Sequence, residues 1–553
     1  MSPSTVLAVD EPRLGYHREA FSPEEAAILS RFFTNVDRPV FAIVNLPEVV
    51  KGALFARYSR SPKSVRRLFL DEFVQQPELG VAAIARRLQE EDGALGTKRA
   101  EDLYERVFNE YGDDSVAQLG GVHLACEQSS NLLTKVLERG RLAAYLEQST
   151  RYMLYDQKLG DGYRYLIPPE VAGGSLAEDY RRTMDGLFET YSELAGRLIA
   201  HYEARFPKAP GDSNFVWRST IRAKACDTAR GLLPAATLSN VGIYASGQAY
   251  ETLLLRMRAH PLAEVRGYAH LILEELRRVI PAFMKRVDRP DRGGAWSAYL
   301  AETASRTEEL ARRVEDEPQQ RPEVTLVEWD PEAELKVVAA ALYPHSNLPD
   351  DQLLEVARRM SAEERAAVMA ACVGQRGNRR HKPGRAMERT FYRFDILCDY
   401  GIFRDLQRHR LLTLDWQRLG TSHGYVLPPA VGEIEAQERW RHAMERAADL
   451  HDRVAERLGG EVAQYVVPFA YRIRFSMQLN ARAAFHLIEL RTQQSGHSGY
   501  RRVCSEMHRL IRDRAGHHLI ADAMSFVDHH DYELERLEAE RRAAARREAM
   551  SST

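Results

Sequence analysis

The hydrophobic and polar positions along the chain predict a helix-rich protein with short strands between the helices. Residues 40–44 form a short apolar run and predict a strand, and VTLVEW at 324–329 predicts another. Apolar residues at 132, 133, 136 and 137 follow helical spacing. Helices are predicted at 46–58, 63–73, 131–137, 177–206, 213–231, 246–287, 331–343 and 480–491.

The two ends of the chain also predict helices. Ser22 stands before Pro23 and two glutamates, which is the pattern of a capped helix start. The segment 533–550 is rich in good helix formers, with Glu and Arg four residues apart. Its apolar stripe is thin, so a solvated helix is favoured over a coiled coil.

Two polar clusters with related sequences predict an internal duplication. RGRLAAYLEQSTRY begins at Arg139, and an altered version, RHRLLTLDWQRLGT, begins at Arg408. Three more pairs of segments match in the same order, at 49–59 and 334–344, 165–172 and 425–432, and 251–258 and 485–492. One weak match carries little, but four in order favour a fusion of two copies of one unit.

The length of 553 residues exceeds what one core supports, so several domains are expected. EDEPQQRP at 315–322 is charged, contains prolines and lacks apolar residues, which is typical of a linker. The predicted organisation is an extension at 1–38, a first copy at 39–314, the linker at 315–322, a second copy at 323–530 and a helical tail at 531–553.

Composition narrows the class of protein. Apolar residues make up 44% and charged residues 28%, as in ordinary globular proteins, and the net charge of −2 argues against a general nucleic-acid binder. The five cysteines show no CxxC spacing, which favours a reducing cytoplasm over a disulfide framework. Neither a signal peptide nor a membrane span is visible, so a cytoplasmic protein is expected.

The first polar cluster has the chemistry of an anion site. Arg139, Arg141 and Arg151 surround Ser149 and Thr150, and guanidinium groups suit phosphate oxygens. The alternative is structural, because cations at the end of a helix stabilise its dipole and its last carbonyls. Spacing alone leaves both interpretations open.

The second cluster places a histidine between two arginines. Arg408 and Arg410 would lower the pKa of His409 and favour a neutral ring that stacks or hydrogen-bonds. A surface histidine without a role is the alternative. The helix at 480–491 carries further polar residues, for which a solvated helix face is the simplest interpretation.

The sequence lacks the common motifs for metals and nucleotide cofactors. His518 and Asp522 would share a helical face, but no HExxH or similar pattern supports a metal site, and none is expected. GxGxxG after a strand, GxxxxGK[ST] and GxSxG are also missing. A nucleotide cofactor would therefore bind outside the Rossmann and P-loop schemes.

The polar clusters resemble the flavin-dependent thymidylate synthases, whose signature reads RHRxxSxNExSxRY. The first cluster matches it at Arg139, Arg141, Glu147, Ser149, Arg151 and Tyr152, with Gly140 and Leu146 departing from it. The second keeps Arg408, His409 and Arg410, but has Trp416, Arg418 and Gly420 at the later positions. Val136 and Asp405 stand where the family has a glutamine.

Residues downstream extend this resemblance over most of 40–525. The first copy has Arg230 before Leu233 and Pro234, as in the family's Arg-x-x-Leu-Pro stretch. The second copy has the family's Asn-x-Arg at Asn480 and Arg482, and Arg491 ends the following helix. Glu388 precedes the second cluster like a family glutamate.

The resemblance implies an α+β fold in two tandem copies, with helices packed on a curved antiparallel sheet and helical extensions at both ends. It implies reductive methylation of dUMP to dTMP, with FAD as cofactor and NADPH and methylenetetrahydrofolate as co-substrates. The family assembles as a homotetramer, so a homodimer of the fused chain is expected to form a tetramer-like body, without nucleic acid or membrane.

The resemblance also assigns roles to residues of this chain. Catalytic roles are expected for Ser149, Arg139 and Arg408. Cofactor binding is expected for Glu388, Arg408, His409, Arg410, Asn480 and Arg482. Substrate binding is expected for Arg139, Arg141, Glu147, Gln148, Ser149, Arg151, Arg230 and Arg491.

The two copies have lost different parts of the motif. The second keeps the flavin-side residues and the first keeps the nucleotide-side loop, which suggests a composite site with one wall from each copy. Two alternatives stay open. One is a flavin-dependent modification of another pyrimidine nucleotide, such as hydroxymethylation, and the other is a degenerate homologue that only binds flavin or nucleotide.

Overall fold

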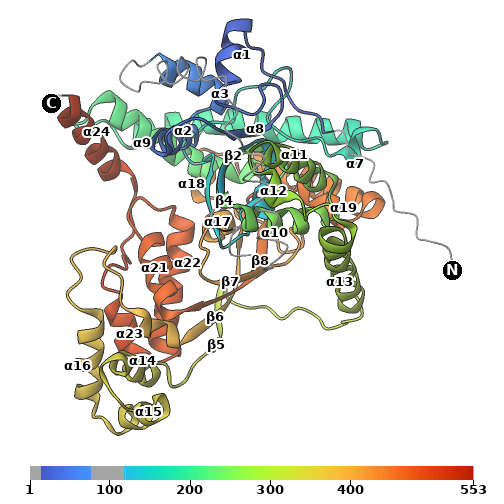
Figure 1. Ribbon diagram of the computed structural model, residues 1–553. Helices are drawn as coiled ribbons and strands as arrows, with labels where there is room; N and C mark the ends of the chain where they lie inside the picture. The colour runs from blue at the N-terminus through green and yellow to red at the C-terminus, as the bar shows by residue number, and fades with distance from the viewer. Residues whose placement is uncertain (1–13, 76–117, 119, 552–553) are drawn as a thin grey trace. The chain divides into compact units, whose positions relative to one another are not determined.

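The computed structural model describes residues 14–75, 118 and 120–551, and its chain divides into two compact units (Figure 1). Unit 1 comprises Met1–Ser192, Leu233–Glu317 and His442–Val467. Unit 2 comprises Glu193–Leu232, Pro318–Arg441 and Pro468–Thr553. Each unit therefore contains sequence from both halves of the chain. None of the helices described is both long enough and apolar enough to traverse a lipid bilayer.

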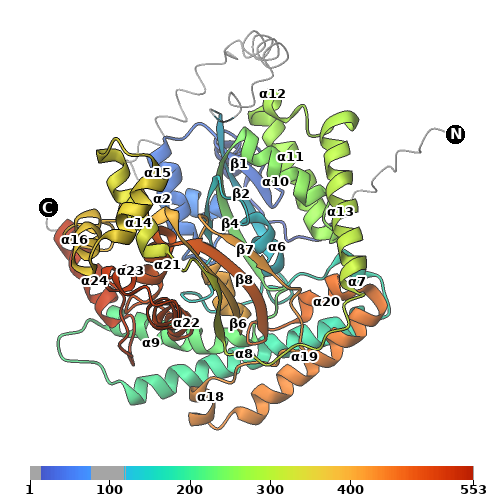
Figure 2. The same ribbon diagram turned by 90° about the horizontal axis from the view of Figure 1, so that it is seen from below.

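Unit 1 is built on a four-stranded antiparallel sheet in the order β1-β2-β4-β3. Its strands are β1 Val40–Ile43, β2 Gly121–Ser130, β3 Ala143–Glu147 and β4 Leu238–Ser246. Its helical segments include α1 Pro23–Leu29, α2 Glu48–Tyr58, α3 Val65–Leu68, η1 Phe69–Val74, α6 Asn131–Leu137, α7 Pro169–Ala172, α10 Gly247–Arg258, α11 Ala263–Val279, α12 Pro281–Met284, η5 Pro290–Gly294, α13 Ala295–Ala311, α20 Gly460–Ala463 and η8 Gln464–Val466. Figure 2 shows α10 and α11 beside this sheet, and α13 next to α10.

Helix α2 packs its apolar face onto the sheet of unit 1. Phe55 lies over Gly242 of β4, where a Cβ atom would approach the phenyl ring to 2.7 Å. Gly242 is therefore needed for the close approach of the helix. Phe41 and Ala125 of the same sheet belong to the buried cluster that Phe55 completes.

Unit 2 repeats the sheet with the order β5-β6-β8-β7. Its strands are β5 Val324–Trp329, β6 Phe391–Asp399, β7 Thr413–Trp416 and β8 Arg472–Asn480. Its helical segments include α9 Asn214–Ala229, η4 Arg230–Leu232, α14 Ala333–Leu342, η6 Tyr343–His345, α15 Asp350–Arg359, α16 Ala362–Val373, η7 Arg385–Arg389, α17 Tyr400–Leu406, α18 Pro429–Glu433, α21 Ala481–Arg491, α22 Ser498–Arg509, η9 Leu510–Arg514, α23 His518–Ala523 and α24 Leu537–Ser551. Figure 1 shows α14, α15 and α16 grouped beside α23.

The matching strand orders confirm the predicted α+β fold in two copies. Two long helices, α8 Ala177–Arg205 and α19 Gln437–Leu458, each have residues in both units. Along β6 and β8 in unit 2, buried residues alternate with half-buried ones, as expected for strands with one covered face. Phe394 and Phe475 are among those that face the core.

Local patterns predicted one edge strand of each sheet and many helices. The strands predicted at 40–44 and 324–329 are β1 and β5, and the helix predicted at 131–137 is α6. Strands β2, β3, β4, β6, β7 and β8 were not predicted; β2 and β4 are buried at most positions, so they lack the polar alternation of a half-covered strand. The range predicted as helical at 246–287 contains α10, α11 and α12, with breaks near Pro261 and Pro281.

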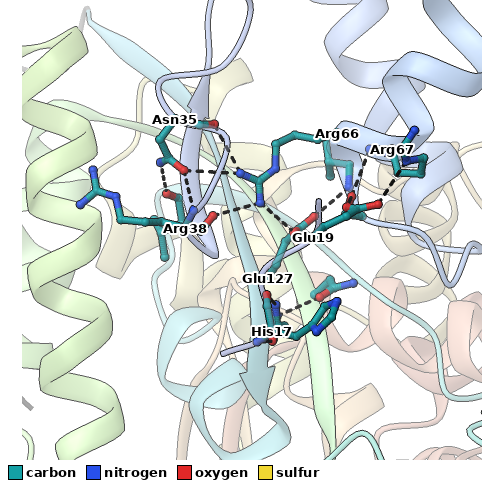
Figure 3. A network of polar contacts seen from close by, with 12 residues as sticks. His17, Glu19, Asn35, Arg38, Arg66, Arg67 and Glu127 are labelled. Carbon is teal, nitrogen blue, oxygen red and sulfur yellow. Dashed lines mark hydrogen bonds and ion pairs between the residues drawn. The ribbon is translucent and has the colours of Figure 1, made fainter. Parts of the chain in front are cut away.

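A buried ion pair anchors the N-terminal segment within unit 1 (Figure 3). Arg66 lies with its Nη2 atom 3.6 Å from Glu127, donates to the Arg38 carbonyl at 3.0 Å and stacks over Phe41. Both Arg66 and Glu127 are 4% exposed. Burial raises the pKa of Glu127, and Arg66 opposes that rise.

Glu264 of α11 is a second buried carboxylate in unit 1. The backbone and hydroxyl of Ser130 donate to it at 2.8 and 2.6 Å, and Tyr465 donates at 2.7 Å. Burial raises the pKa of Glu264 to about 7, although these donors favour the charged form. The same hydroxyl of Ser130 accepts from the Leu133 N–H and caps α6.

The raised pKa of Glu264 predicts a loss of stability with rising pH. The unfolded carboxyl ionises near pH 4.5, so stabilisation is complete below that value and falls by roughly 3 kcal/mol as pH rises through 7. Glu264→Gln keeps an uncharged hydrogen-bonding group that does not ionise. The melting temperature of this variant relative to the wild type should therefore rise between pH 5 and pH 8. Calorimetry checks this, with the exposed Glu309→Gln as control; a difference independent of pH would contradict it.

Candidate functional site

The arginine motif of the second copy follows helix α17 in unit 2. Asp399 caps this helix by accepting from the Ile402 N–H at 2.9 Å. The helix ends at Leu406, whose carbonyl accepts from the His409 N–H at 3.2 Å. Arg408 and Arg410 are exposed and His409 is half-buried.

His409 is held against the end of helix α21. The Nε atom of Arg491 donates to Nε2 of His409 at 2.9 Å, so the neutral ring carries its proton on Nδ1. The ring of His486 lies 5.4 Å away, edge-on. Burial lowers the pKa of His409 well below its ordinary value, and Arg491 lowers it further. The direction of this pKa shift is the one predicted from the sequence, but its causes are burial and then Arg491, rather than the adjacent arginines.

Asp405 joins residues from the two halves of the chain. Its carboxylate accepts from Nη1 of Arg230 at 3.3 Å and lies 3.9 Å from Nη1 of Arg491. Arg491 also donates to the backbone carbonyl of Asp405. Arg230 comes from the first copy, whereas Asp405 and Arg491 come from the second. Within unit 2, two arginines predicted for the substrate therefore share one acid.

A second polar group surrounds the start of helix α21. Glu388 accepts from Arg482 at 3.2 Å, and Arg482 also donates to the Pro383 carbonyl at 3.0 Å. Asn480 caps the helix by accepting from the Ala483 N–H at 2.8 Å. Burial lowers the pKa of Lys382, and the nearby Arg482 lowers it further. Glu388, Asn480 and Arg482 thus lie together, as the flavin assignment expects.

The basic loop before these residues is tied to the same helix, which spacing alone did not predict. Arg376 forms a bidentate ion pair with Glu489 of α21. Its Nη1 and Nη2 atoms donate to the two carboxylate oxygens at 2.6 and 2.5 Å. Glu489 is 1% exposed, and Arg376 lies over the rings of Phe485 and Phe526. The loop carries Lys382, so the buried pair determines where that cation lies.

The first copy's motif lies in unit 1. Arg139 and Arg141 follow α6 and are exposed. Glu147 ends β3, is 3% exposed and lies 3.4 Å from the buried ammonium group of Lys135. Lys135 also donates to Glu138 at 2.9 Å. Glu147 therefore contributes to an internal ion pair of unit 1.

The loop after β3 is fixed largely by its backbone. Gln148 is 1% exposed, and its side-chain amide donates to the Ser61 carbonyl at 2.6 Å. The Ser149 N–H donates to the Ser59 carbonyl at 3.1 Å, and its hydroxyl accepts from the Arg151 N–H at 3.2 Å. Arg151 is 9% exposed. Ser149 and Arg151 are thus arranged by one tight turn.

The histidine-rich segment near the C-terminus has structural contacts. Asp522 pairs with Arg512, and His517 Nδ1 contacts the Tyr392 hydroxyl at 2.9 Å. Within the ranges that the structure describes, no three His, Cys, Asp or Glu side chains gather in a way that would hold a metal ion.

Comparisons with known proteins extend over both copies. The family model described as thymidylate synthase complementing protein matches residues 70–282 and 325–515. A UPF0159 protein of Chlamydia muridarum is 39% identical over 95% of this chain and 99% of its own length. A UPF0159 protein of Thermoplasma acidophilum is 32% identical over 89% and 97%. A flavin-dependent thymidylate synthase of Clostridium tetani is 27% identical over 39% of this chain and 83% of its own length.

The contact between Arg491 and His409 predicts that replacing Arg491 changes the pKa of His409. Replacing Arg491 by leucine removes a cation that disfavours the imidazolium, so the pKa of His409 should rise toward its ordinary value. NMR of protein labelled with ¹⁵N in histidine follows this pKa. Arg509→Leu, which alters an exposed arginine of α22, should leave it unchanged. An unaltered pKa in the Arg491 variant would overturn the assignment.

Proposed function

The chain belongs to the thymidylate synthase complementing protein family, and we propose that it is a FAD-dependent enzyme that methylates dUMP to dTMP. Methylenetetrahydrofolate would supply the one-carbon group and NADPH the reducing electrons. A flavin held by this chain would supply the hydride chemistry of the reaction. The chain's own residues bind and orient the reactants.

The residues around α21 fit a flavin cofactor. Burial lowers the pKa of Lys382, and the positive charge of Arg482 lowers it further, so a pyrophosphate beside both would relieve their repulsion. Neutral His409 can hydrogen-bond or stack without adding charge. The observation that carries the proposal is the grouping of Glu388, Arg482 and the His409–Arg491 pair on one helix and its neighbours.

The shared acid supports a site that draws on both copies. Arg230 and Arg491 would offer guanidinium groups to a nucleotide phosphate. Asp405 holds both near one point before any substrate binds. Arg230 comes from the first copy and Arg491 from the second. One tandem chain therefore supplies, within unit 2, two arginines that would otherwise come from separate protomers. On this basis we expect a homodimer that forms a tetramer-like body, acting in the cytoplasm.

One observation favours a second candidate, a flavin-dependent reaction on another pyrimidine nucleotide such as hydroxymethylation. Asp405 stands at the family's glutamine position and adds a negative charge beside both arginines. A like charge opposes the approach of a phosphate dianion. A substrate with its phosphate placed elsewhere would avoid that repulsion.

Flavin binding tests the cofactor assignment. The purified chain should bind FAD and acquire flavin absorbance. His409→Ala and Arg482→Ala should each weaken binding by about tenfold, or ~1.4 kcal/mol, because each removes a direct contact. Arg359→Ala, on the exposed side of α15, is the matched control. Titration followed by flavin fluorescence measures the affinity. A folded wild-type protein that binds no FAD would refute the proposal.

A thymidine-requiring bacterial strain tests the reaction itself. The wild-type chain should restore growth without thymidine, whereas Arg408→Ala should not, because that variant lacks a cation assigned to both cofactor and catalysis. Expression of both proteins at equal levels is the control. Product analysis with purified protein separates methylation from hydroxymethylation. If a FAD-loaded protein fails to restore growth, the second candidate is favoured.

A further inference from the structure

Unit 2 contains a cavity of about 570 Å³ beside the start of strand β8, and its described lining carries an excess of positive charge. The charged residues of that lining are Arg321, Glu323, Arg472, Arg474 and Arg502. Glu323 accepts from Nε and Nη2 of Arg502 at 2.9 and 2.7 Å in a bidentate ion pair. The carboxylate of Glu323 is thus already engaged, which leaves three arginines around the cavity and favours an anionic ligand.

The cavity lies on the face of the sheet that is turned away from helix α17. The ring of Phe403 in α17 packs against Phe475 of β8, with their centroids 5.0 Å apart. Side chains alternate between the two faces of a strand, so Arg474 and Arg472 lie on the opposite face. The described lining includes none of the residues assigned to flavin or nucleotide binding. The cavity is therefore separate from the group around Asp405.

The two arginines of β8 have donors that the described residues satisfy only in part. Nε of Arg474 is buried and makes no hydrogen bond within the described part of the chain, and an oxygen of Asp395 lies 3.8 Å from it. Nη1 of Arg472 donates to the His423 carbonyl at 3.3 Å. A buried donor without an acceptor is destabilising, so such a group calls for an acceptor from a ligand.

The loop that carries His423 is fixed against strand β8. The Arg472 N–H donates to the Gly424 carbonyl at 3.0 Å, and Gly424 has φ of +68°, a conformation that favours glycine. Burial lowers the pKa of His423, and Arg474 and Arg472 lower it further, whereas Asp395 opposes this shift. Both cations therefore lie near the imidazole ring, which lines the same cavity.

The corresponding place in unit 1 is uncharged on the strand and partly occupied by the chain itself. Leu238 of β4 and Arg472 of β8 each lie opposite the residue that caps the helix after the second strand of their sheet. Asn240, two residues after Leu238, thus stands at the position of the second arginine. In unit 1 the N–H of His17 donates to the Gln128 side chain at 2.8 Å, and a cavity of about 180 Å³ remains there.

We propose that this cavity of unit 2 binds a polyphosphate group, either as inorganic pyrophosphate or as part of a nucleoside triphosphate. Arg472 and Arg474 pair with phosphate oxygens, which suit the guanidinium fork, and the ring of His423 adds a hydrogen bond. Linked phosphates are favoured over a single one because Arg321 adds a cation from the segment before β5. Apart from His423, the described lining carries no aromatic ring, so charge rather than stacking determines the affinity.

Histidine NMR signals of the full-length chain test the site without reference to flavin chemistry. In protein labelled with ¹³C in histidine, pyrophosphate should shift the signal of His423 and saturate it, and His423→Gln identifies that signal. Sulfate at equal ionic strength should bind at least about tenfold more weakly, because it carries one anionic group instead of two. Movement of the His409 signal alone, no movement of any signal, or equal binding of sulfate overturns the proposal.

Two further anions distinguish the sources of the polyphosphate. Tripolyphosphate and ATP both carry three linked phosphates, and only ATP adds a nucleoside. Tighter binding of ATP at His423 identifies a nucleotide as the natural ligand, whereas equal or tighter binding of tripolyphosphate identifies the inorganic anion. Binding of neither anion at His423 contradicts the proposal.

Two variants test the role of the arginines. Arg474→Met removes the guanidinium group but keeps an apolar chain, so the affinity for pyrophosphate should fall at least about tenfold. Arg321→Met alters an exposed residue and should weaken binding about threefold. Arg359→Met, on the exposed side of α15, removes the same charge elsewhere and should leave the affinity unchanged. Unchanged affinity in a folded Arg474→Met protein overturns the proposal; where that variant misfolds, unchanged affinity in Arg321→Met does so.

Discussion

The carboxylate of Asp405 is the interaction on which the candidate site depends. Arg230, 3% exposed, and half-buried Arg491 lie beside it, and guanidinium groups removed from water need an acid nearby to offset their lost hydration. Asp405 supplies that acid to both, and Arg491 in turn donates to His409. The direction of two arginines therefore follows from the placement of one carboxylate at the end of α17, whereas burial and then Arg491 lower the pKa of His409.

The two units differ in the side chains that surround the start of the helix after their second strand. In unit 1, Tyr465 and Glu264 close a hydrogen-bonded cluster around Ser130, the residue that caps α6. In unit 2, Asp399 caps the corresponding helix, and the Trp440 ring lies against Gly231, where a Cβ atom would approach it to 2.8 Å.

The arrangement of segments explains how a tandem chain can share residues between copies. Residues 193–232 of the first half belong to unit 2, and residues 442–467 of the second half belong to unit 1. Arg230 lies at the end of the first exchanged segment and Gln464 in the second. An arginine in one and an amide in the other give the two units different charges at equivalent positions. The divergence of the copies is thus chemical as well as structural.

The sequence alone determined the duplication, the α+β class, the helix starts and the composition of both arginine motifs, because these depend on local spacing and on residue type. Strand β1, helix α6 and the capped start of α1 followed from such local signals. Tertiary structure decided which residues meet. Arg230 reaches Asp405 from 175 positions away, and Lys135 faces Glu147 across the turn after α6. It also decided that Gly231 lies against the Trp440 ring, because such packing depends on every neighbouring side chain at once, and periodicity along one segment carries no information about that.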